Sequence, residues 1–343
     1  MASRNDPTLS VIVVAERHSE CLRLTLESVG AQTIASELEC IVVTRSSADL
    51  ALADDTAHGL HSLRVVEDSA MDDAGKAKAA GVRSARAPLV AFIEDHSYPD
   101  PGWAEALVKA YASSPSAAVG PVVLNANPTS HASWGCFLVY YGMYMQARPP
   151  GQVRHLPGNQ SSYRKEILLE YGSRLPEMLQ AEITLHAELR ARGMTLRQEP
   201  AAKVLHLNYA RVGPATTEYY LASRVFAAQR RRKWATARRL VYACGSPLLP
   251  LIRVRRILAQ ARGAGLSAGA TAGALGPALL ILCAGAAGEC LGYACGAGGA
   301  RAALMRFERE HAGLFTRQDL EVVSSSRRLH QEAPDVQGRP HDA

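Results

Sequence analysis

The sequence lacks the cysteine patterns of a zinc site or of a disulfide framework. Its seven cysteines are odd in number, none forms a C-x-x-C pair, and most lie in apolar surroundings. Such cysteines indicate buried free thiols in a reducing compartment. The polar stretch 1–8 also lacks the basic start and apolar core of a signal peptide. We therefore expect a cytoplasmic protein.

Two further signals are missing. No G-x-G-x-x-G follows the first predicted strand, which argues against a dinucleotide oxidoreductase. The arginine runs are not interleaved with aromatic residues and no nucleic-acid motif is present, so we expect no nucleic-acid partner. What the chain does have is ordinary hydrophobic content over 343 residues and a net charge of +6. These values fit a folded protein with an anionic partner such as a phosphate or an acidic lipid.

Strands and helices alternate through the first 212 residues. Compact β-branched or apolar runs predict buried strands over 9–15, 40–43, 63–66, 89–93, 118–124 and 203–207. Helical spacing predicts helices over 19–29, 74–85, 103–111 and 181–192, with Ser19 as the first N-cap and Gly193 after the last helix. This alternation predicts the α/β class, with βαβ units and a mostly parallel sheet flanked by helices.

The composition changes after Gly213. Arginine runs at 230–233 and 238–239 adjoin apolar sequence, and residues 263–288 carry no charge. We expect a helical extension over 213–316, whose basic flanks either contact an anionic membrane face or are simply solvated. The uncharged stretch is long enough to span a bilayer, but its Ala/Gly content and Pro277 favour a buried or re-entrant hairpin. Residues 317–343 are polar and are expected to be disordered.

The most informative motif follows strand 89–93. It ends in Glu94, Asp95 and His96, and a Pro/Gly turn comes next. In α/β sheets ligands bind beyond the carboxyl ends of strands, where carboxylates and an imidazole can hold a divalent cation against a phosphate. The motif therefore suggests a metal-diphosphate site, with Mn²⁺ as well as Mg²⁺ compatible with the imidazole. The alternative is that both acids cap the following turn.

In order and spacing, residues 9–208 resemble the inverting family 2 glycosyltransferases with a GT-A fold. The resemblance is carried by the helix end 26–33, Glu94-Asp95-His96 at the Asp-x-Asp position, Pro101-Gly102-Trp103, Gly158-Asn159 before Arg164, Glu182 with Leu185, Leu189 and Gly193, and the late strand ending in His206. Residues 288–293 add a weaker likeness to the C-terminal helices of exopolysaccharide-type members.

The resemblance implies a catalytic domain over 1–212 that moves a sugar, of the hexosyl type, from a nucleotide-sugar donor with inversion. Its acceptor would be a glycan or a lipid-linked molecule at the inner face of the cell membrane, as in polysaccharide assembly. Glu182 would be the general base, and Asp95, His96 and His206 would hold the Mn²⁺ or Mg²⁺. The donor would be bound by Ala15, Glu16, Arg45, Glu94, Asp95, Gly158 and Asn159.

Simpler interpretations remain open for several of these residues. Glu182 is favourable at a helix start in any case, Gly158-Asn159 could form an ordinary turn, and Arg45 could be an exposed loop charge. Glu16-Arg17 and Thr44-Arg45-Ser46 also replace the Tyr-Asn and Asp-Asp-Gly of the family. These departures support an alternative, a non-catalytic nucleotide-sugar-binding or scaffold protein that retains the fold.

Overall fold

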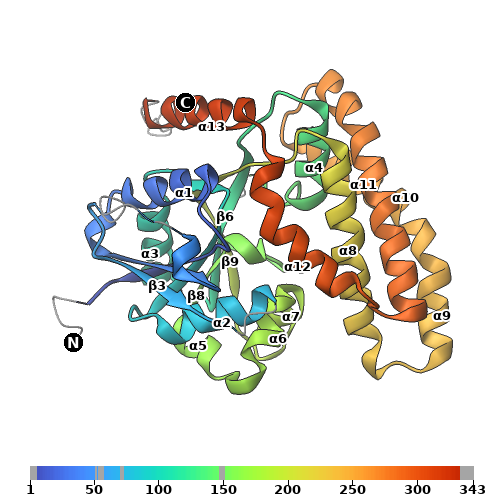
Figure 1. Cartoon of the computed structure of the whole chain (residues 1–343), viewed down its shortest axis with the longest axis horizontal. Helices are drawn as coiled ribbons and strands as arrows, with labels where there is room; N and C mark the ends of the chain where they lie inside the picture. Colours follow the sequence, from blue (N-terminus) through green and yellow to red (C-terminus); the bar gives the residue numbers. More distant parts are fainter. Residues whose placement is uncertain (1–5, 51, 53–57, 70–72, 147–150, 333–343) are drawn as a thin grey trace, which may run out of the picture.

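The structure is a computed structural model that describes residues 6–50, 52, 58–69, 73–146 and 151–332. Figure 1 shows two parts side by side: a sheet with its covering helices, and a group of long helices. The strands are β1 (Leu9–Val14), β2 (Leu38–Thr44), β3 (Ser62–Glu67), β4 (Leu89–Glu94), β5 (Ser97–Pro99), β6 (Ala118–Asn125), β7 (Gly151–Gln152), β8 (Ser162–Arg164) and β9 (Leu196–His206).

These strands form one mixed sheet in the order β3-β2-β1-β4-β8-β6-β9-β5, with β7 paired to β9. The long pairings, β1 with β2 and β4, β2 with β3, and β6 with β9, are parallel. The short strands β5, β7 and β8 pair antiparallel to their neighbours. The predicted α/β class with a mostly parallel sheet flanked by helices is confirmed.

The helices of the sheet domain are α1 (Glu20–Gly30), α2 (Ala74–Ser84), α3 (Trp103–Ser113), α4 (His131–Tyr140), α5 (Lys165–Leu169), α6 (Leu175–Gln180) and α7 (Glu182–Ala191). As predicted, the Ser19 hydroxyl caps α1 by accepting from the Leu22 amide at 3.1 Å. Gly193 follows α7 with φ +78°, a conformation that favours glycine.

Residues of β1 alternate between the two faces of the sheet, so each face has its own core. Val11 and Val13 pack with Leu26 of α1 and Trp103 of α3. Ile12 belongs to the opposite cluster, which contains residues of α2, α6 and α7. This layering fixes the carboxyl ends of β1 and β4 at one edge of the sheet.

The predicted helical extension is present as α8 (Val212–Arg230), α9 (Thr236–Gly245), α10 (Leu249–Gly263), α11 (Ala268–Cys295) and α12 (Ala300–Glu310). The uncharged stretch forms one continuous helix, α11, and not the expected hairpin. By length and composition α11 could cross a membrane. It packs against α4, α8, α9 and α10, and glycines on α11 allow the close approach to α8: a Cβ on Gly288 would lie 2.3 Å from the Tyr220 carbonyl oxygen.

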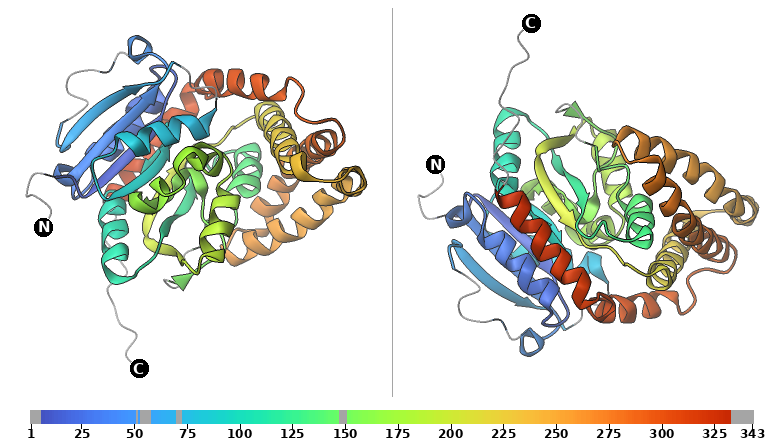
Figure 2. Two further views of the ribbon diagram at one scale, coloured as in Figure 1. Left: turned by 90° about the horizontal axis from the view of Figure 1, so that it is seen from below. Right: turned by 90° about the horizontal axis from the view of Figure 1, so that it is seen from above.

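The expectation of disorder from residue 317 is wrong for the described part of the tail. Residues Arg317–Glu332 form helix α13, which lies alongside α1 (Figure 2). Val323 on α13 is buried in the same apolar cluster as Leu24 of α1, and the buried Asp319 accepts hydrogen bonds from Thr316. Tertiary burial thus stabilises a segment whose composition alone indicates a coil. Residues 333–343 lie outside the described residues.

Candidate active site

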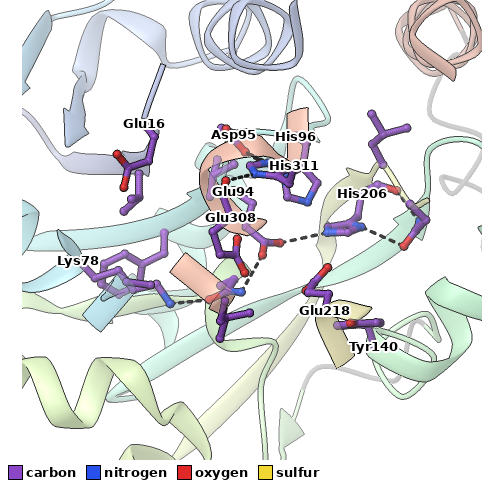
Figure 3. Close-up of a pocket in the computed structure, with 18 of the residues that line it drawn as sticks. Glu16, Lys78, Glu94, Asp95, His96, Tyr140, His206, Glu218, Glu308 and His311 are labelled. Atoms are coloured by element: carbon purple, nitrogen blue, oxygen red, sulfur yellow. Dashed lines mark hydrogen bonds and ion pairs between the residues drawn. The ribbon is translucent and has the colours of Figure 1, made fainter. Parts of the chain in front are cut away.

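A pocket opens at the carboxyl ends of β1, β4 and β9, with a cavity volume of about 230 Å³. Helix α2 and the turn η4 (Gly158–Gln160) close one side of it. Helices α4, α8 and α12 close the other, so the extension completes the wall (Figure 3). Both the sheet domain and the C-terminal helices therefore shape this site.

Glu94, at the end of β4, is held as a carboxylate by several donors. Its Oε2 accepts from the Tyr141 hydroxyl at 2.6 Å and the Gln160 amide at 2.7 Å, and its Oε1 accepts from the Asn159 amide at 2.7 Å. The Nε2 of His206 lies 3.1 Å from Oε2. Burial alone would raise the pKa of Glu94, but His206 and these hydrogen bonds hold that pKa well below its usual range.

The hydrogen bonds around His206 fix its tautomer. The Asn208 side-chain amide donates to Asn125 Oδ1 at 3.0 Å and to the His206 carbonyl at 2.8 Å, so Asn208 Oδ1 is the acceptor for His206 Nδ1 at 3.2 Å. Burial lowers the pKa of His206 despite the opposing effect of Glu94. Nε2 is the ring nitrogen that faces Glu94 Oε2, and at 3.1 Å a proton or a cation must lie between these two atoms.

His96 is oriented in the same manner. Its Nδ1 donates to Asp95 Oδ1 at 2.9 Å, which leaves Nε2 without a hydrogen bond among the described residues. Asp95 Oδ1 also accepts from His311 Nε2 at 3.0 Å, and His311 Nδ1 donates to the Glu308 carbonyl. Burial disfavours both charges, yet each stabilises the other: Asp95 raises the pKa of His311 to about 10, and the pKa of Asp95 lies well below its usual range.

Two groups of possible metal ligands result, and His96 belongs to both. Glu94, His96 and His206 bring their ligand atoms within 4.8 Å of one another, and so do Asp95, His96 and His311. The predicted set of Asp95, His96 and His206 does not form one such group among the described residues. Glu94 takes the predicted place of Asp95 beside His206, because adjacent residues at a strand end point in different directions. Two imidazole nitrogens and one carboxylate form a ligand set that could hold a divalent cation.

Glu182 begins α7, as predicted, and lies next to the pocket-lining Lys78 without lining the pocket itself. It forms an ion pair with Lys78 of α2, and Lys78 also donates to Asn159 Oδ1. Asn159 in turn donates to Glu94, so Glu182 is connected to the candidate metal group through two lining side chains. A Cβ on Gly158 would lie 2.5 Å from the Glu182 side chain. Only glycine permits this contact, so Gly158 here packs against Glu182.

The three predicted donor residues near β1 and β2 are placed differently from one another. Glu16 lines the pocket. Arg45 lies 3.4 Å from Glu16 and does not line the pocket itself. Ala15 is only 3% exposed and belongs to the core. Of the three, Glu16 alone is positioned to contact a ligand with its side chain.

Several lining residues escaped the sequence reasoning. From sequence, the cations of stretch 74–86 could attract a diphosphate or, as the favoured interpretation, form a solvated helix face; the fold leaves Lys78 only 7% exposed and places it on the pocket wall. Glu218 of α8 and Glu308 of α12 project into the pocket from the extension, where sequence separation gives no signal (Figure 3). Burial and repulsion from Glu308 raise the pKa of Glu218 to about 8. His311 lies 216 residues from its partner Asp95, which no local motif could reveal.

Comparisons with known proteins add the following. A family model described as glycosyl transferase family 2 matches residues 10–172. A search of curated proteins gives no match. Among solved structures, a crystal structure of GalNAc-T7 with UDP, GalNAc and Mn²⁺ is similar at a TM-score of 0.46 and 14% identity, over 68% of this chain and 52% of that one. The chain thus spans about half the length of that protein.

Proposed function

We propose, from the match of residues 10–172 to glycosyl transferase family 2, that the chain transfers a sugar from a nucleotide-sugar donor, with inversion, to a glycan or lipid-linked acceptor. The observation that carries the proposal is the convergence of Glu94, His96 and His206 at the end of β4, inside a pocket. One fixed carboxylate and two oriented imidazoles form a ligand set for a divalent cation.

A divalent cation at these three residues would act as a Lewis acid on the donor diphosphate. The chain's own groups supply the remaining chemistry. Lys78 places a positive charge on the pocket wall, where it favours an anionic donor. Lys78 also forms an ion pair with Glu182, the carboxylate that we assign to accept the proton of the acceptor hydroxyl. Direct displacement by that hydroxyl inverts the sugar carbon, because the attack comes opposite the leaving diphosphate.

The test is transfer and hydrolysis across a panel of nucleotide sugars, with Mn²⁺ or Mg²⁺ and with glycan or lipid-linked acceptors. We expect the wild type to turn over one donor and Glu182→Gln to bind that donor with turnover reduced about 100-fold or more. A Glu182→Gln protein with near-normal turnover refutes the assigned base. Donor binding without turnover by the wild type favours the non-catalytic binding protein.

The lipid-linked acceptor agrees with one exposed surface of the extension. Helix α9, the turn η7 (Ser246–Leu248) and α10 form an elbow, residues 236–263, remote from the sheet (Figure 1). Five of its large apolar side chains are 54–68% exposed: Leu240, Val241, Leu248, Leu251 and Ile252. Arg238, Arg255 and Arg256 flank them and are exposed. An apolar strip bordered by arginines is complementary to an anionic lipid surface.

We therefore assign this elbow to peripheral contact with the inner face of the cell membrane. Vesicles with anionic lipid should cosediment the wild type at low salt, whereas Leu251→Glu should reduce the bound fraction about tenfold. Leu169→Glu is the matched control, since Leu169 is 42% exposed on α5, in the sheet domain. Equal binding by all three proteins, or binding to no vesicle, refutes the assignment and leaves the transfer reaction in place.

A further inference from the structure

We propose that residues 311–319, here named the C-terminal strap, position the two imidazoles of the candidate cation site. The strap lies outside the matched residues 10–172 and reaches the site from the far end of the chain. This inference rests on the proposed function, because it concerns the same site. It assigns His311 and Asp319 as positioning residues, each of which acts through an intermediate side chain.

The first arm of the strap is His311. Its Nε2 donates to Asp95 Oδ1 at 3.0 Å, and the same oxygen accepts from His96 Nδ1 at 2.9 Å. The donation from His311 Nδ1 to the Glu308 carbonyl keeps the ring from turning away. Because Asp95 is only 6% exposed, solvent cannot easily replace His311 as its donor. His311 therefore holds Asp95 where it fixes the tautomer and direction of His96.

The second arm is Asp319. The Asn127 side chain donates to Asp319 Oδ1 at 3.1 Å and to the Asn208 carbonyl at 2.7 Å, and its Oδ1 accepts from the Asn208 backbone N–H at 3.0 Å. Asn208 accepts from His206 Nδ1 at 3.2 Å. Asn127 and Asn208 are at most 1% exposed, so these hydrogen bonds are shielded from solvent. Asp319 thereby orients Asn127, which holds Asn208 against His206.

Packing joins the two arms between His311 and Asp319. The Phe315 ring stacks on Tyr209 at 5.3 Å between centroids and lies 5.5 Å from the His96 ring. Phe315 is 8% exposed. Its side chain therefore limits the rotation of the neighbouring His96 ring.

Partners of this kind set metal affinity because they fix ring orientation and keep the coordinating nitrogen unprotonated. Loss of such a partner typically weakens metal binding about 10–100-fold. If the strap contributed only packing, its substitutions would lower stability. Replacements of equal size would then have the same metal affinity whether or not they can form hydrogen bonds. The two roles can therefore be separated by comparing replacements of similar size that differ in hydrogen-bonding groups.

The experiment measures binding of Mn²⁺ alone to the full chain by electron paramagnetic resonance, so no donor or acceptor is needed. We expect His311→Leu to weaken Mn²⁺ binding about 10–100-fold. His311→Gln, whose amide can still donate to Asp95, should remain within about threefold of the wild type. Asp319→Ala tests the second arm and should also weaken binding. Glu321→Gln is the matched control, because Glu321 is 65% exposed on the same helix.

The outcomes separate the strap from the site itself. Binding that His96→Ala abolishes but His311→Leu and Asp319→Ala leave unchanged refutes the positioning role and preserves the cation site. Equal weakening by His311→Leu and His311→Gln also refutes it, since packing then explains the loss. A wild type that binds no Mn²⁺ refutes the cation site of the proposed function. Circular dichroism checks folding, and if His311→Leu fails to fold, Asp319→Ala and His311→Gln decide the question.

Discussion

Gly158 offers the sharpest test of the connection between the loop and the candidate base. A Cβ built at this position would lie 2.5 Å from Cγ and Cδ of Glu182 and 2.7 Å from its Cβ. Rotation of the Glu182 side chain cannot relieve the contact with Cβ, so either α7 or η4 must move. Either movement separates Glu182 from Lys78, which is its ion-pair partner.

The expected cost of Gly158→Ala is that of overpacking, about 1–3 kcal/mol of unfolding free energy. At roughly 2–4 °C per kcal/mol, Tm should fall by about 2–12 °C. Because a displacement of about 1 Å can cost about 100-fold in rate, we expect turnover to fall at least tenfold. Thermal melts by circular dichroism and initial rates with the active donor measure the two effects.

The matched control is Gly102→Ala in the turn before α3. Nothing lies within 4 Å of a Cβ there, and the backbone φ of −89° suits alanine. We expect Tm and turnover of this variant to stay close to wild type. If Gly158→Ala matches Gly102→Ala in both Tm and turnover, Glu182 does not pack against the loop. The connection from Glu182 through Lys78 and Asn159 to Glu94 is then refuted.

Three further perturbations test the site. Lys78→Met leaves Glu182 without its ion-pair partner and should cost about 3 kcal/mol of stability and most of the turnover, while Mn²⁺ affinity changes little; an unchanged Tm contradicts this. Glu218 has a pKa near 4.5 in the unfolded state and about 8 in the folded state, so between these pH values only the folded state holds the proton and stability falls as pH rises. Because Gln is neutral at every pH, the Tm of Glu218→Gln should exceed that of the wild type by a margin that grows from pH 5 to pH 8. A pH-independent difference in Tm contradicts the assignment. A chelator should abolish sugar transfer and added Mn²⁺ should restore it; chelator-resistant turnover refutes the cation site.

Local sequence predicted the framework of the site. The apolar runs that became β1, β2 and β4 predicted parallel strands, and the abrupt change at Glu94, Asp95 and His96 predicted polar groups at a strand end. Both signals are short-range, because a buried strand must be apolar and its carboxyl end meets the ligand edge of the sheet. The cap at Ser19 and the glycine at 193 were likewise readable from single residues.

Which groups face one another was decided by tertiary structure. Sequence order cannot tell whether Glu94 or Asp95 points toward His206, because neighbouring residues at a strand end differ in direction. The helix α13 forms in a polar segment because α1 offers Val323 an apolar surface.

The sequence by itself determined that an α/β sheet would present acids and an imidazole at the end of β4, because hydrophobic patterning is a local property. Only the tertiary structure decided that Lys78 is buried against Glu182 and that His311 holds Asp95. Contacts between residues so far apart depend on how whole helices pack, and helix packing is set by the combined surfaces of many residues.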